Sequence, residues 1–282
     1  MSRSPEILLE GLTFPEGPRW HEGRFWFSDF YTHRVLALGG DGKTEVVAEV
    51  PGQPSGLGWL PDGRLLVVSM LDRKLLRLDT TGLVAAADLS KIATWHCNDM
   101  VVDAEGRAYV GHFGFDLLGG GEFRTSHLIL ARSDGSVEVA ADDMHFPNGA
   151  VVTPDGSTLI VAESFAKRLT AWDRDPDGRL ENRRVFADLG EYGPDGICLD
   201  AEGAVWVAAP RQHEAIRVFE GGRIAERISL GDRLAIAPML GGEDRRTLYL
   251  CTNAVLAPDE AVKQRAGRIE ALQVEVPGAG LP

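Results

Sequence analysis

Six segments of the chain carry a residue at one shared register. In each segment this residue begins a short apolar run. It stands seven positions before an acidic residue of a turn, or six positions before it in the first segment. The residues at this register are Glu16, Ser55, Asn98, Asn148, Asp195 and, in a degraded sixth copy, Ala237. Carboxylates and amides occupy four of these positions. Two carboxylates buried together are costly without a counter-charge, and a hard cation removes that cost.

The residue types at this register select a class of ion. Carboxylate and amide oxygens, completed by water, suit Ca²⁺, which takes about six to eight oxygen ligands. No Cys or His occupies the register, which argues against a closed zinc site. We therefore expect one divalent ion, Ca²⁺ before Zn²⁺, Mn²⁺, Mg²⁺ or Fe²⁺. Each residue taken alone would only be expected to cap a strand and bind water. The shared register is what favours a metal site.

An internal repeat explains the shared register. In five segments the apolar run ends in Asp-Gly or Glu-Gly and an alternating apolar run follows, which is a β-hairpin signal. The turn glycines Gly23, Gly63, Gly106, Gly156 and Gly203 recur at intervals of 40, 43, 50 and 47 residues. A third and a fourth apolar run follow most hairpins, without helices. Four strands in each unit of this length indicate a six-bladed, all-β propeller.

The two ends of the chain fit one closed ring. The sixth copy stops after its third strand, "GRIEALQVEV", while "PEILLEG" precedes the first copy as a fourth strand would. The N-terminal strand is thus predicted to complete the last blade, and residues 1–282 to form one domain. A β-sandwich or barrel is the alternative fold. The longest interval holds "GHFGFDLLGGGEFRTSH", which is predicted to be a mobile loop over one end of the channel.

Composition limits the partners. The chain has 282 residues and a net charge of −13, which argues against nucleic acid and anionic membrane surfaces. No apolar run approaches the roughly 20 residues of a membrane span, and no signal peptide is recognisable. The three cysteines, Cys97, Cys198 and Cys251, are widely spaced and suggest free thiols in a reducing cytoplasm. The sequence does not indicate an oligomeric state.

The motifs "FPEGPRW", "NDMVVDAEGRAYVG", "FPNGAVVTPDGSTLIVAES" and "GPDGICLDAEGAVWVA" resemble those of the SMP-30/gluconolactonase/luciferin-regenerating-enzyme family. Members of that family are six-bladed propellers and mostly metal-dependent lactonases. The resemblance implies that Glu16, Asn148 and Asp195 are metal ligands and that Asn98 contacts metal or substrate. It also points to Asp195 as the base that takes a proton from water, and it implies that Gly149 lets the backbone pass close to the ion.

Other residues near these motifs are candidates for chemistry or binding. A carboxylate bound to a dication is a poor base, so His96 and His112 are alternatives that titrate near neutral pH. If neither acts as a base, His96 is expected to be a hydrogen-bonded loop residue and His112 a residue that faces solvent. Trp95 is close enough to Asn98 in sequence to form a pocket wall. The tryptophans expected to pack between blades are Trp20, Trp26, Trp59 and Trp206. Asp116 and Glu122 in the long loop could bind substrate hydroxyls, although surface charges are the simpler interpretation.

The sequence departs from sugar-lactone members of the family at two places. His96 stands where such members often carry arginine, and "APM" replaces the usual Cys-containing stretch of the sixth blade. Histidine has fewer donors than arginine, and the neighbours Trp95, Phe113 and Phe115 are apolar. We therefore expect a lactone with fewer hydroxyl groups than gluconolactone. A calcium-dependent aryl-ester or organophosphate hydrolase and a non-catalytic metal- or ligand-binding propeller are the alternatives.

Overall fold

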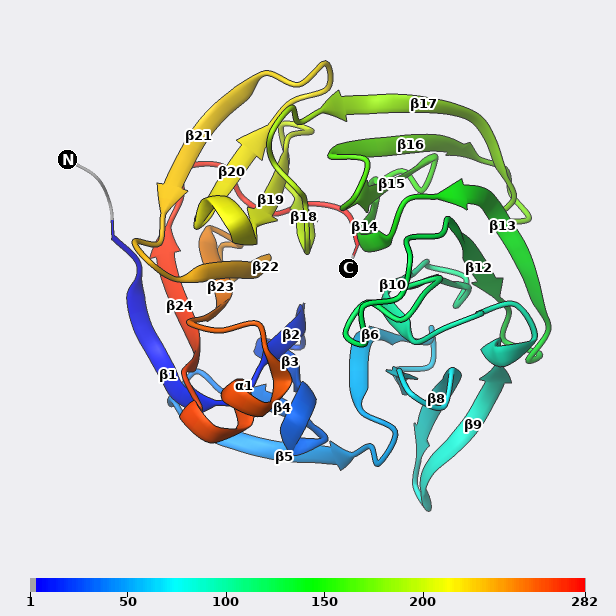
Figure 1. The fold of residues 1–282 in the computed structure, drawn as a ribbon, viewed down its shortest axis with the longest axis horizontal. Helices are drawn as coiled ribbons and strands as arrows, with labels where there is room; N and C mark the ends of the chain where they lie inside the picture. The colour runs from blue at the N-terminus through cyan, green and yellow to red at the C-terminus, as the bar shows by residue number, and fades with distance from the viewer. Residues whose placement is uncertain (1–3, 282) are drawn as a thin grey trace.

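Six antiparallel sheets of four strands are arranged in a ring around a central channel (Figure 1). The computed structural model describes residues 4–281. The fold is a six-bladed β-propeller, as the repeat predicts. In every blade the first strand of the repeat is the innermost, so residues at one register of the repeat meet around the axis.

The strands follow the repeat closely. Blades one to three consist of β2 (Pro15–His21), β3 (Arg24–Asp29), β4 (Arg34–Leu38), β5 (Thr44–Glu49); β6 (Pro54–Trp59), β7 (Leu65–Ser69), β8 (Lys74–Asp79), β9 (Gly82–Asp88); and β10 (Cys97–Val102), β11 (Ala108–His112), β12 (Ser126–Ala131), β13 (Val137–Met144). Blades four and five consist of β14 (Pro147–Val152), β15 (Thr158–Glu163), β16 (Arg168–Arg174), β17 (Leu180–Asp188); and β18 (Ile197–Leu199), β19 (Val205–Ala209), β20 (Glu214–Val218), β21 (Ile224–Ser229).

The sixth blade closes the ring with both ends of the chain. It contains β22 (Leu234–Gly241), β23 (Thr247–Asn253) and β24 (Gly267–Gln273), and its outermost strand is β1 (Glu6–Leu12). Strand β1 pairs antiparallel with β24, with Glu6 opposite Ala271. The predicted closure by the N-terminal strand is confirmed. It pairs a sheet edge that a linear array would leave open.

The hairpins between first and second strands form one end of the propeller, the turn end. The five turn glycines have φ between 71° and 83°, a region that L-residues with a Cβ rarely adopt. The C-terminal segment crosses this end, where Leu281 bridges Val152 and Gly278 bridges Asp200. The repeat gives no indication of this crossing, because the segment lies outside it.

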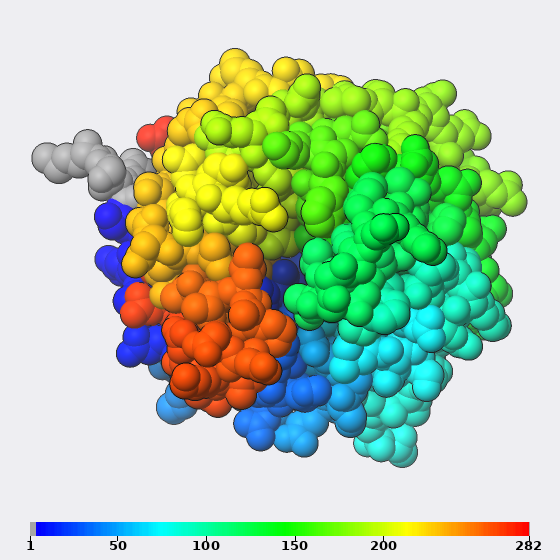
Figure 2. All heavy atoms as spheres, viewed as in Figure 1, coloured from blue at the N-terminus to red at the C-terminus, as the bar shows by residue number. Residues whose placement is uncertain are grey.

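The opposite end, the mouth end, is built from the loops that join second to third strands and one blade to the next. It carries the short helices η1 (Phe30–Thr32), η2 (Leu89–Lys91), η3 (Pro210–Gln212) and α1 (Pro258–Gln264). Apart from these short segments the fold is nearly all β, as the sequence predicts. Figure 2 shows a hollow at the centre of this end, between the orange segment that contains α1 and the green long loop.

Apolar side chains fill the spaces between neighbouring blades. Trp20 of the first blade stacks on Tyr249 of the sixth, with ring centroids 5.6 Å apart. Trp59 of the second blade stacks on His21 of the first at 3.9 Å. These contacts confirm that tryptophans pack between blades. Within residues 4–281, no helix is both long enough and apolar enough to span a bilayer.

Candidate metal centre and channel mouth

A β-bulge interrupts the innermost strand of five blades near the shared register. The shifts fall at Glu16/Arg19 in β2, Pro54/Leu57 in β6, Cys97/Met100 in β10, Pro147/Ala150 in β14 and Ala235/Ala237 in β22. A bulge leaves a residue unpaired and re-aims its side chain. In the fifth blade Asp195 precedes β18 and its N–H donates to the carbonyl of Ala208 at 2.9 Å. The polar residues thus belong to irregular backbone, which frees them from strand alternation.

Glycines after the polar residues allow the inner strands to approach one another. A Cβ on Gly149 would lie 2.5 Å from the backbone nitrogen of Ile197, and one on Gly56 would lie 2.4 Å from that of Met100. Both are too close for real atoms. The sequence interpretation had Gly149 making room for an ion, but the contact it permits is with the next blade. Close packing of the inner strands is what brings the polar side chains together.

Glu16 and Asp195 form a buried carboxylate pair at the axis. Glu16 is only 6% exposed, and Asp195 keeps partial exposure. Burial, followed by the charges of Asp195 and Asp99, raises the pKa of Glu16 well above its usual value. Burial also raises the pKa of Asp195 to about 7. No lysine or arginine in residues 4–281 forms an ion pair with either carboxylate, so a bound cation would relieve a cost that the protein itself leaves in place.

The two predicted amides lie beside this pair. Asn148 is within hydrogen-bonding reach of Asp195, which partly offsets the rise in the pKa of that carboxyl. The amide nitrogen of Asn148 also donates to Ser164 Oγ at 3.3 Å, and that of Asn98 donates to the carbonyl of Pro147 at 3.4 Å. Each amide nitrogen thus has a protein acceptor. Amide oxygens are ligands that Ca²⁺ accepts.

The donor set fits a hard divalent cation and not a thiophilic one. Among the residues that the structure describes, no group of three or more His, Cys, Asp and Glu side chains is arranged to hold an ion. A metal here must therefore use amide oxygens and water beside the two carboxylates. Cys251 lies near Glu16 but is fully buried, and burial raises the pKa of its thiol well above the usual value. It is a packed thiol rather than a ligand.

Arg19 and Asp99 are buried at the same axis and were not identified from the sequence. The Arg19 Nη2 atom donates to Asp99 Oδ1 at 2.6 Å, and both side chains are less than a tenth exposed. The charge of Asp99 also contributes to the raised pKa values of Glu16 and Asp195. A sequence signal did exist, because Asp99 stands where four of the other copies have glycine.

The two candidate histidines occupy different surroundings. His96 is half-buried at the mouth, its ring stacks on Trp95 at 5.2 Å, and burial lowers its pKa. His112 is completely buried, and burial lowers its pKa to about 4. The His112 Nε2 atom accepts the backbone N–H of His127 at 3.1 Å. Substrate contact by His112 stays a prediction, and this placement disfavours it, since the ring has no exposed surface.

A wall of aromatic rings lines one side of the mouth end. Its members are Trp95, His96, Phe113, Phe115, Phe123, Phe146 and Phe165, with successive ring centroids 4.7–6.3 Å apart. Phe165 follows Ser164, the hydrogen-bond partner of Asn148, so the wall stands beside the proposed ligands. Phe123 and Phe165 remain 44% and 43% exposed. Glu122 is exposed on the long loop next to Phe123, and Asp116 lies near His96.

Residues 14–254 match the sequence profile described as the SMP-30/gluconolactonase/LRE-like region. The chain belongs to this family. It is 25% identical to a pentonolactonase of Haloferax volcanii over 93% of this chain and 91% of that protein. It is 28% identical to a 6-deoxy-6-sulfogluconolactonase of Pseudomonas putida, over 66% of this chain and 64% of the relative. It is also 28% identical to regucalcin of Danio rerio, over 63% and 60%. The last two matches span less than two thirds of the relatives.

Solved structures show the same SMP-30-like fold at lower identity. A luciferin-regenerating enzyme aligns with a TM-score of 0.83 at 21% identity, covering 99% of both chains. A regucalcin of Agrobacterium tumefaciens, described as a calcium-binding protein, aligns with a TM-score of 0.82 at 24% identity, covering 99% of this chain and 96% of that one. At these identities the likeness establishes the architecture alone. The chemistry has to be argued from the residues at the axis.

Proposed function

We propose that this protein is a divalent-metal-dependent lactonase whose ion is held by Glu16, Asn148 and Asp195, with Asn98 adjacent. The observation that carries the proposal is a pair of carboxylates, Glu16 buried and Asp195 partly buried, that forms no ion pair with any arginine or lysine of residues 4–281 and stands beside two amides. Ca²⁺ is the proposed ion, since all the donors are oxygens. The lactonase names among the family relatives support the reaction class.

The chain's own residues supply positioning and proton transfer. A bound divalent ion would supply polarisation of the lactone carbonyl and stabilisation of the developing oxyanion. In this scheme the side-chain oxygens of Asn98 and Asn148 would be the further protein ligands. His96 is neutral at pH 7 because burial lowers its pKa, so it is able to take a proton from attacking water. Asp195 is the other proposed base. Its raised pKa gives it proton affinity before the ion binds.

The aromatic wall defines the proposed substrate class. Trp95 and Phe113 flank His96 where a sugar ring would need several hydrogen-bonding partners. Donors left unpaired against such a wall lose about 1–3 kcal/mol each. We propose an alkyl- or aryl-substituted lactone in preference to gluconolactone. Glu122, exposed on the long loop, is proposed as a polar contact at the rim.

One panel of substrates tests the proposal. The purified protein is assayed on γ- and δ-lactones, gluconolactone, aryl esters and phosphotriesters, after chelation and after addition of Ca²⁺, Mn²⁺ or Zn²⁺. We expect ion-dependent lactone hydrolysis, fastest on the less hydroxylated rings. Turnover confined to aryl esters or phosphotriesters would reassign the enzyme class. Ion binding without turnover of any substrate would make it a non-catalytic ion-binding propeller. A gluconolactone efficiency more than about tenfold above that of simple lactones would refute the proposed specificity.

A further inference from the structure

At two positions near the axis one copy of the repeat carries a charged residue where the other copies do not, and the two charges are of opposite sign. The residue after the shared register is glycine in four copies, proline in the sixth and Asp99 in the third. The residue three positions after the register is Arg19 in the first copy, whereas the other copies have Gly58, Val101, Val151, Cys198 and Leu240. A single acid and a single base have thus replaced small or apolar residues in two different blades.

These two exceptions contact each other across the axis. Arg19 extends from the first blade, where its Nη1 donates to the carbonyl of Pro18 at 2.7 Å. Its Nε reaches the carbonyl of Leu57 in the second blade at 2.8 Å, and its Nη2 reaches Asp99 in the third at 2.6 Å. Asp99 Oδ1 also accepts the N–H of Met100 at 2.8 Å. Both of these hydrogen bonds end on the same oxygen of Asp99.

The pair lies close enough to the carboxylates to act on their charge. Arg19 shares strand β2 with Glu16, and Asp99 directly follows Asn98 on strand β10, so both belong to the segments that carry the proposed ion site. Counting ionised groups, three carboxylates and one guanidinium give a net charge of −2 within this buried volume. A single divalent ion neutralises that charge.

A purely structural account explains only part of this arrangement. Arg19 joins the inner strands of three blades, and a well-packed apolar pair would join them at least as well. Asp99 then has no structural reason to replace glycine beside two carboxylates, where like charges repel. The arrangement is explained if the charge itself is used.

We propose that Arg19 and Asp99 tune the ion centre, fixing its net charge at the value that a divalent cation neutralises. The inference rests on the ion site proposed above. Neither residue is a ligand in this scheme. Arg19 engages Asp99 and holds it in place, and together they determine how strongly the centre attracts two positive charges rather than one or three.

Direct ion titration of the whole protein, without substrate, tests the inference. Asp99→Asn keeps the shape and the acceptor for Arg19 but removes one negative charge, so Ca²⁺ should bind at least about tenfold more weakly. Arg19→Met removes the positive charge, so Tb³⁺ should gain at least about tenfold in affinity relative to Ca²⁺. The double variant restores the net charge and should return Ca²⁺ affinity to within about threefold of wild type.

The control is a buried Asp–Arg pair at the turn end. Asp200 accepts from Arg217 Nε at 2.6 Å, and Asp200→Asn should leave Ca²⁺ affinity unchanged. If Arg19→Met does not fold, Asp99→Asn and the double variant decide the question. Equal Ca²⁺ affinity in Asp99→Asn and wild type, or an equal loss in Asp200→Asn, would overturn the inference while leaving the ion site intact. Wild-type protein that binds no divalent or trivalent ion would overturn both.

Discussion

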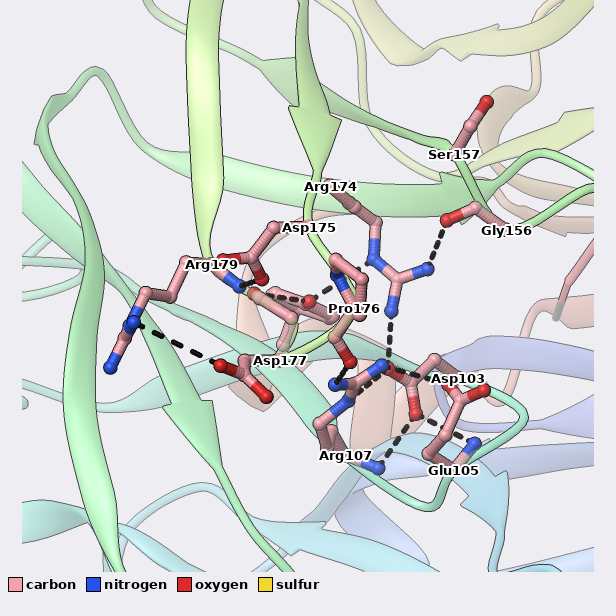
Figure 3. Close-up of polar contacts among 12 residues, drawn as sticks. Asp103, Glu105, Arg107, Gly156, Ser157, Arg174, Asp175, Pro176, Asp177 and Arg179 are labelled. Atoms are coloured by element: carbon pink, nitrogen blue, oxygen red, sulfur yellow. Dashed lines mark hydrogen bonds and ion pairs between the residues drawn. The ribbon is translucent and has the colours of Figure 1, made fainter.

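The two ends of the propeller treat buried carboxylates in opposite ways. At the turn end Asp103 is 3% exposed and accepts from Arg107 at 2.6 Å and from Arg174 (Figure 3). Asp200 is paired with Arg217 in the same manner. At the mouth end Glu16 and Asp195 are buried together, and among the described residues neither has a cationic side chain as partner.

The difference separates acids that hold the fold from acids prepared for a ligand. Arg107 of the third blade pairs with Asp103 and donates to the carbonyl of Pro176 in the fourth blade. Arg174 of the fourth blade also pairs with Asp103, so these contacts tie the two blades together. At the mouth end the nearby guanidinium of Arg19 forms its ion pair with Asp99 instead, which leaves the charge of Glu16 and Asp195 for something from solution. Burial alone does not identify a functional acid. The missing partner does.

Exposed apolar side chains show the same asymmetry. The exposed large apolar residues in loops all belong to the mouth end: Leu71, Leu117, Leu118, Phe123, Phe165, Leu256 and Val262. The remaining exposed ones lie on the outermost strands of the blades, and among the described residues none is in a turn-end hairpin. The end with unpaired carboxylates is thus also the end able to bind an apolar molecule.

The largest expected effect comes from neutralising the carboxylates that lack a cationic partner. Asp195→Asn and Glu16→Gln should each lower ion affinity and lactone turnover by at least about a hundredfold, because a two-carboxylate site loses half its charge. Neither variant should lower the free energy of unfolding, since each removes an unfavourable buried charge. Ion titration, turnover and thermal unfolding measure the three quantities.

Asp103→Asn is the matched variant at the turn end. It leaves the buried Arg174 without its counter-charge, whereas Arg107 keeps Glu105, so it should lower the free energy of unfolding by about 3–5 kcal/mol. The folded protein should bind the ion as wild type does. If Asp103→Asn lost the ion while Asp195→Asn kept it, the distinction between the two ends would be wrong.

His96→Ala distinguishes two possible roles of His96 at the mouth end, proton transfer and lining of the pocket. If His96 takes the proton from water, kcat should fall by roughly 10²–10⁴ and the acidic limb of the pH profile should disappear. If it only lines the pocket, KM should rise and kcat should hold. Phe113→Leu, which alters the same wall without a titrating group, is the control. Unchanged kcat and KM in His96→Ala would remove His96 from the site.

The repeat made most of the fold predictable, because one hairpin signal recurs in register. It gave the blade number, the order of strands and the closure by β1. It could not give α1 or the C-terminal crossing, since both lie outside the repeated unit. Phe146 shows a further limit. Its ring packs between those of Phe113 and Phe165, which come from separate blades, and no local sequence pattern predicts contacts between such distant residues.

The part of the site that could be predicted is the part formed by equivalent positions of the repeat. Glu16 and Asp195 come from different blades, and only their shared register indicates that they meet. The backbone irregularities that position them, a bulge at Glu16 and the segment before β18 at Asp195, are invisible in sequence because they depend on strand pairing. Arg19 and Asp99 could not be predicted for another reason: they depart from the repeat, and a repeat indicates only what its copies share.

The paired and unpaired acids should also differ in their pH dependence. Burial raises the pKa of Asp195 to about 7 in the folded chain, against 3.8 as its ordinary value. The folded state therefore holds more protons across this interval, and the stability of the ion-free protein should fall as pH rises from about 4 to 7. The loss from this group is on the order of 2–4 kcal/mol. Calcium should restore more stability at pH 8 than at pH 5.

Unfolding by urea with and without chelator, at a series of pH values, measures this effect. Asp195→Asn supplies the reference, because its difference from wild type isolates the one carboxyl group. An ion-free protein whose stability rises between pH 4 and 7 relative to that variant would show Asp195 to be paired in solution.

The smallest expected effect concerns the exposed part of the aromatic wall. Phe123 and Phe165 lie 5.4 Å apart, one on the long loop and one after Ser164. A substituent on a lactone ring would rest against both, so kcat/KM should rise by roughly two- to fourfold for each added methylene, as partial burial of about 0.8 kcal/mol per group implies. Phe123→Ala and Phe165→Ala should flatten that slope and leave the unsubstituted lactone nearly unaffected. Val185→Ala, exposed on β17, should not change it. A slope that survives both phenylalanine variants would place the substituent elsewhere in the mouth.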